Sequence, residues 1–234
     1  MELIEILNYS VAFFTIYTTV FFLLLFLRYK KDYYGAPEWR GEAPAVSIVI
    51  PAYNEEKTIE KCLGSILALD YPQGKLDIIV VDDGSTDATA AEAKKYEKHG
   101  VRVFTKENGG KGAALNYGIA KAGGEFIATM DADSYVTPGV LRALLPYFND
   151  AGVMAVTPAV KIAPGGSVLR EFQRIEYLMI LFSRKLLSYI DAVPVTPGPF
   201  SIFRASVFKE VGGFDEHNLV EDQEIAMRIQ QHHY

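Results

Sequence analysis

The longest apolar stretch of the chain lies near its start. Residues 6–27 contain no charged side chain, and from Val11 to Leu27 nearly every residue is apolar or aromatic. A helix needs about 20 such residues to cross a bilayer. A cleaved signal peptide is the alternative, but it would begin with basic residues, whereas Glu2 and Glu5 come first here. The pattern therefore predicts one transmembrane helix over residues 6–27.

Basic residues follow this stretch directly, at Arg28, Lys30 and Lys31. Positive charge stays on the cytoplasmic side of a membrane, so we expect a protein of the cell membrane whose C-terminal domain is cytoplasmic. Residues 28–44 contain Gly and Pro and predict a juxtamembrane linker. Its aromatic residues could lie at the membrane interface: Tyr33, Tyr34 and Trp39.

From residue 45 onward, short apolar strands alternate with helical patterns. The expected strands are 46–50, 76–81, 101–105, 126–130 and 153–160. The expected helices follow Asn54, which could cap the first, and then span 87–99 with Asp87 as cap, 113–121 and 137–148. This alternation predicts an α/β fold with a mostly parallel, doubly wound sheet.

The pattern changes after about residue 165. Residues 169–189 predict a long helix with an apolar middle at 177–182, flanked by basic residues. An amphipathic helix that lies in the membrane interface, or covers the site next to it, fits this pattern. A buried core helix fits it equally well. Residues 195–204 read as a loop leading into a strand, and a last helix begins at Val220.

Polar side chains gather where the predicted parallel strands end. The set comprises Tyr53, Glu55, Asp82, Asp83, Asp131 and Asp133. Because the carboxyl ends of parallel strands share one edge of the sheet, these residues should converge there, where open α/β sheets bind ligands.

Three residues suggest roles in holding a nucleotide. Tyr53 offers a flat apolar face for a base, and Asp83 can accept a hydrogen bond from a uracil N–H or a ribose hydroxyl. Lys111, in a glycine-rich loop before a helix, could place positive charge near phosphate. That loop lacks the glycine spacing and the Ser or Thr of the ATPase phosphate loop, which argues against ATP hydrolysis.

Asp131 and Asp133 are two hard oxygen ligands one residue apart, which suits Mg²⁺ or Mn²⁺ bound to substrate phosphates. A turn whose acids cap the next helix is the plain alternative. A calcium loop is excluded because its fifth and sixth positions would be Tyr135 and Val136. An aspartate-nucleophile phosphatase would place such a pair on its first strand, not on its fourth.

The composition limits which partners and which compartment we expect for this protein. The net charge is −6 and no long basic run follows residue 31, which argues against a nucleic-acid partner. The single cysteine, Cys62, excludes an internal disulfide framework and fits a reducing compartment.

Taken in order, the motifs resemble those of family 2 glycosyltransferases. They are Pro51–Glu55 (PAYNE), Val81–Asp87 (VDDGSTD), Lys111–Asn116 (KGAALN), Asp131–Asp133 (DAD) and Glu221–Asp222 (ED). The resemblance covers residue 45 to the end. It implies the GT-A fold, with a nucleotide-sugar half at 45–135 and an acceptor half at 136–234.

The resemblance also implies residue roles. Nucleotide-sugar contacts would come from Pro51, Tyr53, Glu55, Asp83, Lys111 and Asp131, and the metal would be held by Asp131 and Asp133. The acceptor side would include Gly198, Pro199, Phe200 and Glu221. Asp222 matches the general base, although Glu221 stays open for that role and a helix-capping acid is the alternative reading of Asp222 alone.

One departure concerns the family's membrane-bound, chain-building members, which carry Gln-x-x-Arg-Trp after the base; the residues after Arg228 do not match it. We expect either a fragment or a chain without a complete acceptor site. The expected activity is that of an inverting transferase acting from a nucleotide-sugar, UDP-linked in the first instance, onto a polysaccharide or lipid-linked acceptor. A subunit that binds the donor but transfers nothing is the alternative, and a sugar-nucleotide pyrophosphorylase ranks last; labelled UDP-sugars with membranes would separate them.

Overall fold

The computed structural model describes residues 2–33, 35, 37–72, 74–162 and 167–232. The chain divides into two compact units, one formed by residues 1–36 and 160–193 and the other by residues 37–159 and 194–234.

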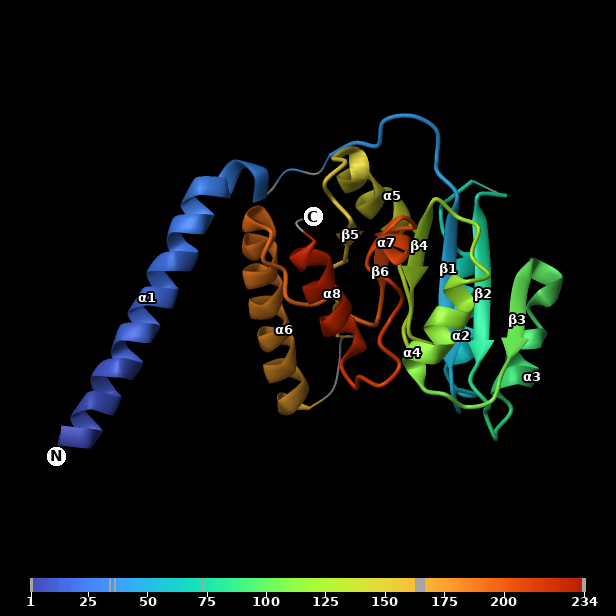
Figure 1. Ribbon diagram of the computed structural model, residues 1–234, viewed down its shortest axis with the longest axis horizontal. Helices are drawn as coiled ribbons and strands as arrows, with labels where there is room; N and C mark the ends of the chain where they lie inside the picture. The colour runs from blue at the N-terminus through green and yellow to red at the C-terminus, as the bar shows by residue number, and fades with distance from the viewer. Residues whose placement is uncertain (1, 34, 36, 73, 163–166, 233–234) are drawn as a thin grey trace. The chain divides into compact units, whose positions relative to one another are not determined.

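The first unit contains two long helices, α1 (Glu2–Tyr33) and α6 (Val168–Leu187), the latter followed by a 3₁₀ turn, η3 (Ser188–Ile190) (Figure 1). Their aromatic rings meet, with Phe26 and Phe182 6.0 Å apart and Tyr29 stacked on Tyr189 at 4.7 Å. Helix α1 is long and apolar enough to cross a membrane. It extends beyond the predicted 6–27, so the expected linker begins as helix; Tyr34 lies outside the described residues.

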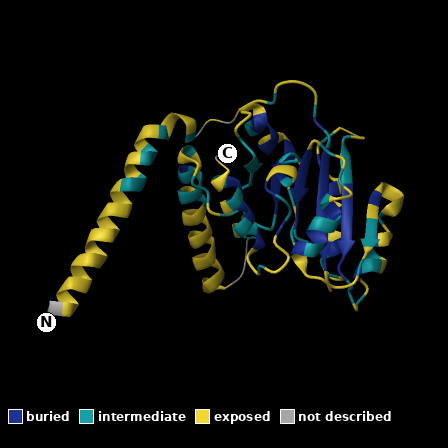
Figure 2. Ribbon diagram, viewed as in Figure 1, coloured by how far each residue is buried: buried dark blue, intermediate teal, exposed yellow. Residues whose placement is uncertain are grey.

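Helix α6 is not a buried core helix, so that interpretation of its pattern is wrong. Of its described residues only Leu186 is buried. Large apolar side chains along its first turns are exposed, among them Phe172, Leu178 and Met179 (Figure 2). The amphipathic interpretation is the one that accounts for this exposure.

The second unit is built on a six-stranded sheet with the order β3-β2-β1-β4-β6-β5. The strands are β1 (Val46–Ala52), β2 (Leu76–Asp82), β3 (Val101–Thr105), β4 (Phe126–Thr129), β5 (Ala155–Val156) and β6 (Ser201–Arg204). Strands β3, β2, β1 and β4 are parallel, whereas β6 pairs antiparallel with β4 and β5. The predicted mostly parallel α/β sheet is confirmed.

Helices cover both faces of this sheet (Figure 1). They are α2 (Ile59–Leu67), α3 (Thr89–Lys94), α4 (Lys111–Ile119), α5 (Val140–Leu144), α7 (Val207–Glu210) and α8 (Glu221–Gln231), with 3₁₀ turns η1 (Glu97–His99) and η2 (Leu145–Asn149). Alternate residues of β1 explain the two layers, since side chains of a strand point to opposite faces. Ile48 and Ile50 pack with α2 and α5, whereas Val49 packs with α4 and α8.

Several boundaries differ from the predictions. The strand expected over 153–160 is only Ala155–Val156, because Pro158 has no N–H to donate to a ladder. The helix expected over 137–148 begins at Val140 and becomes 3₁₀ at Leu145, and the one expected over 87–99 breaks after Lys94 before its 3₁₀ turn.

Two residues have different tasks from those expected. Asn54 does not cap a helix; it has a left-handed backbone, and its Oδ1 accepts the N–H of Thr86 at 2.9 Å, which joins two loops. Trp39 was expected at a membrane interface, but its ring packs edge-on against Phe126 in the core. Its Nε1–H donates to the Glu42 carbonyl.

Two glycines in helices of the sheet unit give opposite predictions for substitution by alanine. A Cβ on Gly118 would lie 2.4 Å from a methyl of Val49, which is a stiff side chain in the core. A Cβ on Gly64 would meet nothing within 4 Å. Gly118→Ala should lower the free energy of unfolding by about 1–3 kcal/mol, and Gly64→Ala should raise it by up to about 1 kcal/mol. Thermal unfolding of the full chain in detergent compares the two, and an unchanged Gly118→Ala variant would contradict the packing of α4 on β1.

Candidate active site

One edge of the sheet collects the predicted site residues because of its topology. The parallel strands β1, β2 and β4 end there, and antiparallel β6 begins there, since Ser201 pairs with Thr129. Helices α4 and α8 also start at this edge, with Lys111 and Glu221 as their first residues. Residues far apart in sequence therefore meet at one place.

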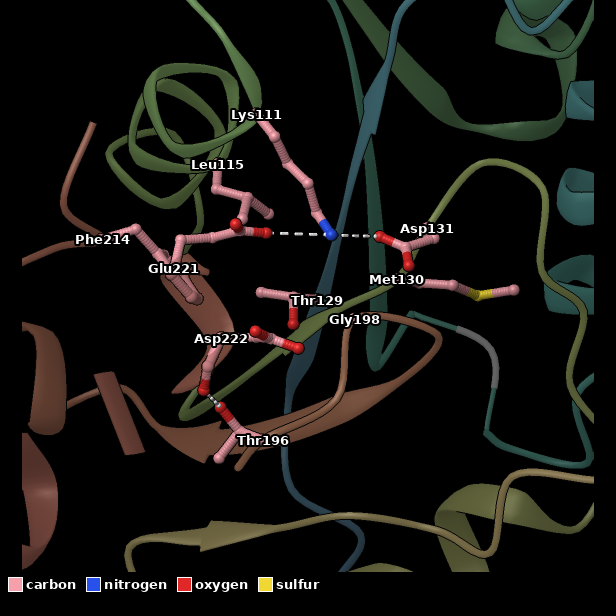
Figure 3. A pocket seen from close by; sticks show the side chains of 10 residues that line it. All are labelled: Lys111, Leu115, Thr129, Met130, Asp131, Thr196, Gly198, Phe214, Glu221 and Asp222. Carbon is pink, nitrogen blue, oxygen red and sulfur yellow. Dashed lines mark hydrogen bonds and ion pairs between the residues drawn. The ribbon is translucent and has the colours of Figure 1, made fainter. Parts of the chain in front are cut away.

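Lys111 lies between two carboxylates (Figure 3). Its Nζ is 2.8 Å from Asp131 Oδ1 and 3.0 Å from Glu221 Oε1. Gly110 precedes it with φ +89, a conformation that favours glycine and turns the chain into α4. Burial lowers the pKa of Lys111, but Asp131 and Glu221 raise it by more, so the side chain stays charged at neutral pH.

Asp131 is held by the loop before β6. Its N–H donates to the Gly198 carbonyl at 3.1 Å. A Cβ on Gly198 would come within 2.6 Å of Asp131 Oδ2 and 2.7 Å of Lys111 Nζ, so a larger residue would require this ion pair to shift. Burial raises the pKa of Asp131 above its ordinary value, with Asp133 and Glu221 adding to the effect, against the opposing attraction of Lys111.

Glu221 and Asp222 differ in their surroundings. The Glu221 side chain is only 10% exposed and is engaged by Lys111. Asp222 is half-buried, and its carboxylate points into the pocket (Figure 3). The backbone carbonyl of Asp222 accepts both the N–H and the hydroxyl of Thr196, at 3.2 and 2.8 Å, which fixes the first turn of α8. Of the two acids, only Asp222 has a carboxylate without an ion pair among the described residues.

Two adjoining pockets share Lys111 and Asp131. The first, a narrow one, is also lined by Leu115, Thr129, Met130, Thr196, Gly198, Phe214, Glu221 and Asp222. The second is wider and is also lined by Pro51, Ala52, Tyr53, Glu55, Asp83, Ala114, Ala132 and Asp133. The residues predicted to hold the nucleotide thus line one pocket, and the predicted base lines the other.

Asp83 makes more contacts within the protein than its predicted role in binding the nucleotide requires. It is almost fully buried, and Lys106 Nζ lies 2.7 Å from its Oδ1. Its carboxylate also accepts the N–H groups of Gly109 and Gly110, at 3.0 and 2.8 Å. Asp83 therefore holds the loop that ends at Lys111, in addition to lining the wider pocket.

The four residues predicted for the acceptor side have different positions, and of these only Gly198 and Glu221 line the narrow pocket. Gly198 lines the narrow pocket, Pro199 is half-buried, and Phe200 packs in the core beside Met130 and Ile202. Phe200 thus has no exposed face toward either pocket, because it precedes the buried strand β6.

Sequence reasoning missed the task of Asn116. Its side-chain amide makes two 2.8 Å hydrogen bonds with the backbone of Phe214, donating to the carbonyl and accepting from the N–H. These bonds tie α4 to the loop that leads into α8. The signal was present, since Asn116 closes the KGAALN motif, but no local pattern reveals a partner 98 residues away.

The donor groups suit a cation shared with a ligand. Within the described part of the chain no group of three His, Cys, Asp or Glu side chains could hold a metal by itself. Mg²⁺ is commonly bound by one or two carboxylates together with substrate phosphates. Asp131 and Asp133, which both line the wider pocket, fit that arrangement.

Solved structures share this fold. A mannosyltransferase, PcManGT from Pyrobaculum calidifontis, in complex with GDP-Man and Mn²⁺, superposes with a TM-score of 0.71 at 26% identity over 91% of this chain and 60% of that chain. TarS of S. aureus (residues 1–349) superposes with a TM-score of 0.60 at 26% identity over 79% and 55%. The fold and the site define the GT-A class of glycosyltransferases.

The family model described as Glycosyl transferase family 2 matches residues 47–212, and the chain belongs to this family. Among curated proteins, it is 30% identical to poly-beta-1,6-N-acetyl-D-glucosamine synthase of Staphylococcus aureus (strain COL) over 98% of this chain. It is 31% identical to the synthase of the same name from Staphylococcus epidermidis over 80% of this chain. The chain spans 57% and 46% of the lengths of these relatives.

The environment of Cys62 gives a test of how α2 packs behind the site. Burial and the negative charges of Asp133, Asp131 and Glu55 raise the pKa of this thiol to about 12. At pH 8 the reactive thiolate is then about a thousandfold scarcer than at the ordinary pKa of 9.0. A thiol reagent should label the native chain at least about 100-fold more slowly than the denatured chain. Since Cys62 is the only cysteine, equal labelling rates would show that α2 does not pack behind Asp131.

Proposed function

We propose that this protein transfers a sugar from a UDP-sugar to a growing polysaccharide or a lipid-linked acceptor at the membrane. The observation that carries the proposal is the pair of adjoining pockets. The wider pocket offers groups for a nucleotide diphosphate, and the narrow pocket is lined by Asp222, whose carboxylate forms no ion pair among the described residues. A transferase needs both, because donor and acceptor must meet at one carbon atom.

In the proposed reaction the acceptor hydroxyl oxygen attacks the anomeric carbon of the donor sugar. Asp222 takes the hydroxyl proton as this new C–O bond forms. The bond from the anomeric carbon to the diphosphate oxygen breaks at the same time, so the electron pair leaves with UDP and the configuration inverts. Glu221, engaged by Lys111, is the less suitable base, because protonating it would weaken that ion pair.

The wider pocket would receive the UDP. Tyr53 is 49% exposed and presents a free ring to a base, and Asp131 and Asp133 would hold Mg²⁺ or Mn²⁺ together with the diphosphate. The cation, when bound, neutralises the charge that develops on the leaving diphosphate. Lys111, at the first turn of α4, would contact a phosphate from the side of the narrow pocket.

The choice of donor rests on the relatives. Those 30% and 31% identical to this chain are named as synthases of a poly-N-acetylglucosamine, which supports UDP-N-acetylglucosamine as the first donor to test. The GDP-Man complex of the mannosyltransferase makes GDP-mannose the comparison donor.

Replacement of the proposed base should separate transfer from binding. Asp222→Asn should reduce sugar transfer by about 10²–10⁴-fold, because the amide cannot accept the hydroxyl proton. UDP affinity should change little, since Asp222 does not line the wider pocket. Transfer of labelled sugar to membrane acceptors and equilibrium binding of UDP, both on the full chain in detergent or vesicles, measure the two quantities.

Glu210→Gln is the matched control for this experiment, because it removes one negative charge from an exposed position on α7. It should transfer sugar at the unmodified rate. Transfer by Asp222→Asn at the same rate as this control would remove Asp222 from its role. A chain that binds UDP but yields no product with any acceptor would favour the donor-binding subunit instead.

We further propose that α1 spans the cell membrane with the sheet unit on the cytoplasmic side and with α6 at the membrane surface. The exposed apolar residues of α6 and the basic residues after the apolar run of α1 support this orientation. Protease added outside right-side-out vesicles should leave the sheet unit intact and should cleave it once the vesicles are opened. Cleavage in sealed vesicles would contradict the orientation.

A further inference from the structure

The Lys111–Asp131 ion pair lines both pockets and stands where they adjoin. On one side of the pair are the groups of the wider pocket, such as Tyr53 and Asp133. On the other side are Glu221 and Asp222. A sugar attached to a diphosphate in the wider pocket would have to approach Asp222 past this ion pair.

The loop before β6 lies against this ion pair. Gly198 lies so close to it that an added Cβ would approach both Lys111 Nζ and Asp131 Oδ2 within 2.7 Å. The Asp131 N–H is bonded to the carbonyl of the same Gly198. Gly198 therefore lies against one side of the pair, and Lys111 is the longer and more exposed of its two side chains.

Electrostatics makes Lys111 the resident cation of this cluster. Asp131 and Glu221 are 25% and 10% exposed, and both ion pairs to Lys111 are 3.0 Å or shorter. Carboxylates this close to each other and this poorly hydrated are unfavourable without a positive charge among them. An incoming divalent cation would meet an Asp131 that is already neutralised.

We propose that the Lys111 side chain pairs with Asp131 and separates the two pockets until the diphosphate of the donor draws it away. Lys111 would thus act as a removable partition between the two pockets. The swing frees Asp131 for the cation and opens the passage from the donor sugar to Asp222. This inference rests on the proposed function, and it adds an order of events: the nucleotide diphosphate must arrive before, or together with, the cation. Binding of metal and of nucleotide is then coupled through one side chain, and the coupling is reciprocal.

The order has a direct test in metal binding without any nucleotide. Mn²⁺ affinity of the full chain in detergent is measured from the EPR signal of free Mn²⁺. Lys111→Met leaves the carboxylates without their resident cation, so it should bind Mn²⁺ about tenfold more tightly than the unmodified chain. Lys111→Gln, which keeps a hydrogen-bonding head group, should change the affinity in the same direction and serves if the methionine variant does not fold. Equal or weaker Mn²⁺ binding by the folded neutral variants would overturn the proposal.

Two controls separate the partition from a general change of charge. Lys209→Met removes the same charge from an exposed position on α7, and Lys209 lines neither pocket. It should leave Mn²⁺ affinity within about threefold of the unmodified value. Lys111→Arg keeps the charge and should stay close to the unmodified chain. An increase in Lys209→Met as large as in Lys111→Met would overturn the proposal.

Added UDP provides the second readout. In the unmodified chain UDP should raise Mn²⁺ affinity, and the factor should be smaller in Lys111→Met, because no lysine remains to be drawn away. An equal factor in both proteins would contradict the partition. An unmodified chain that binds no UDP would instead contradict the proposed function, and the comparison without nucleotide would still stand.

Discussion

Carboxylates that converge at the end of a buried sheet repel each other and lose hydration, so they need a positive charge between them. Lys111 supplies that charge to Asp131 and Glu221. Much of the surrounding structure serves this contact. Asp83 fixes the glycine loop before Lys111, Gly198 leaves room beside the pair, and Asn116 ties α4 to the loop before α8.

The sheet brings these parts together because β6 runs antiparallel to β4. Parallel strands β1, β2 and β4 place residues of the wider pocket at their carboxyl ends, where α/β sheets bind ligands. Antiparallel β6 then starts at the same edge, which places the loop of Gly198 against Asp131. The half of the chain that carries Asp222 is thereby joined to the half that carries Tyr53, at the position where a donor and an acceptor would meet.

Much of this could be predicted from sequence, because strand ends and motifs are local signals. The alternation of apolar runs with helical patterns predicted the sheet, and the carboxyl ends of the strands predicted that Tyr53, Glu55, Asp83, Asp131 and Asp133 converge. What escaped prediction depends on distant partners. The buried position of Phe200, the packing of Trp39 on Phe126 and the bonds from Asn116 to Phe214 are set by residues far away in sequence. The exposed face of α6 could not be distinguished from a core face by periodicity alone.

The central claim is that donor binding moves Lys111 from Asp131 to the diphosphate. A structure of the full chain with UDP and Mn²⁺ tests it most directly. The account predicts Mn²⁺ at Asp131 and Asp133, bridged to the phosphates, with Lys111 Nζ on a phosphate oxygen and the two pockets joined. A structure with UDP and Mn²⁺ bound in which Lys111 still pairs with Asp131 would contradict it.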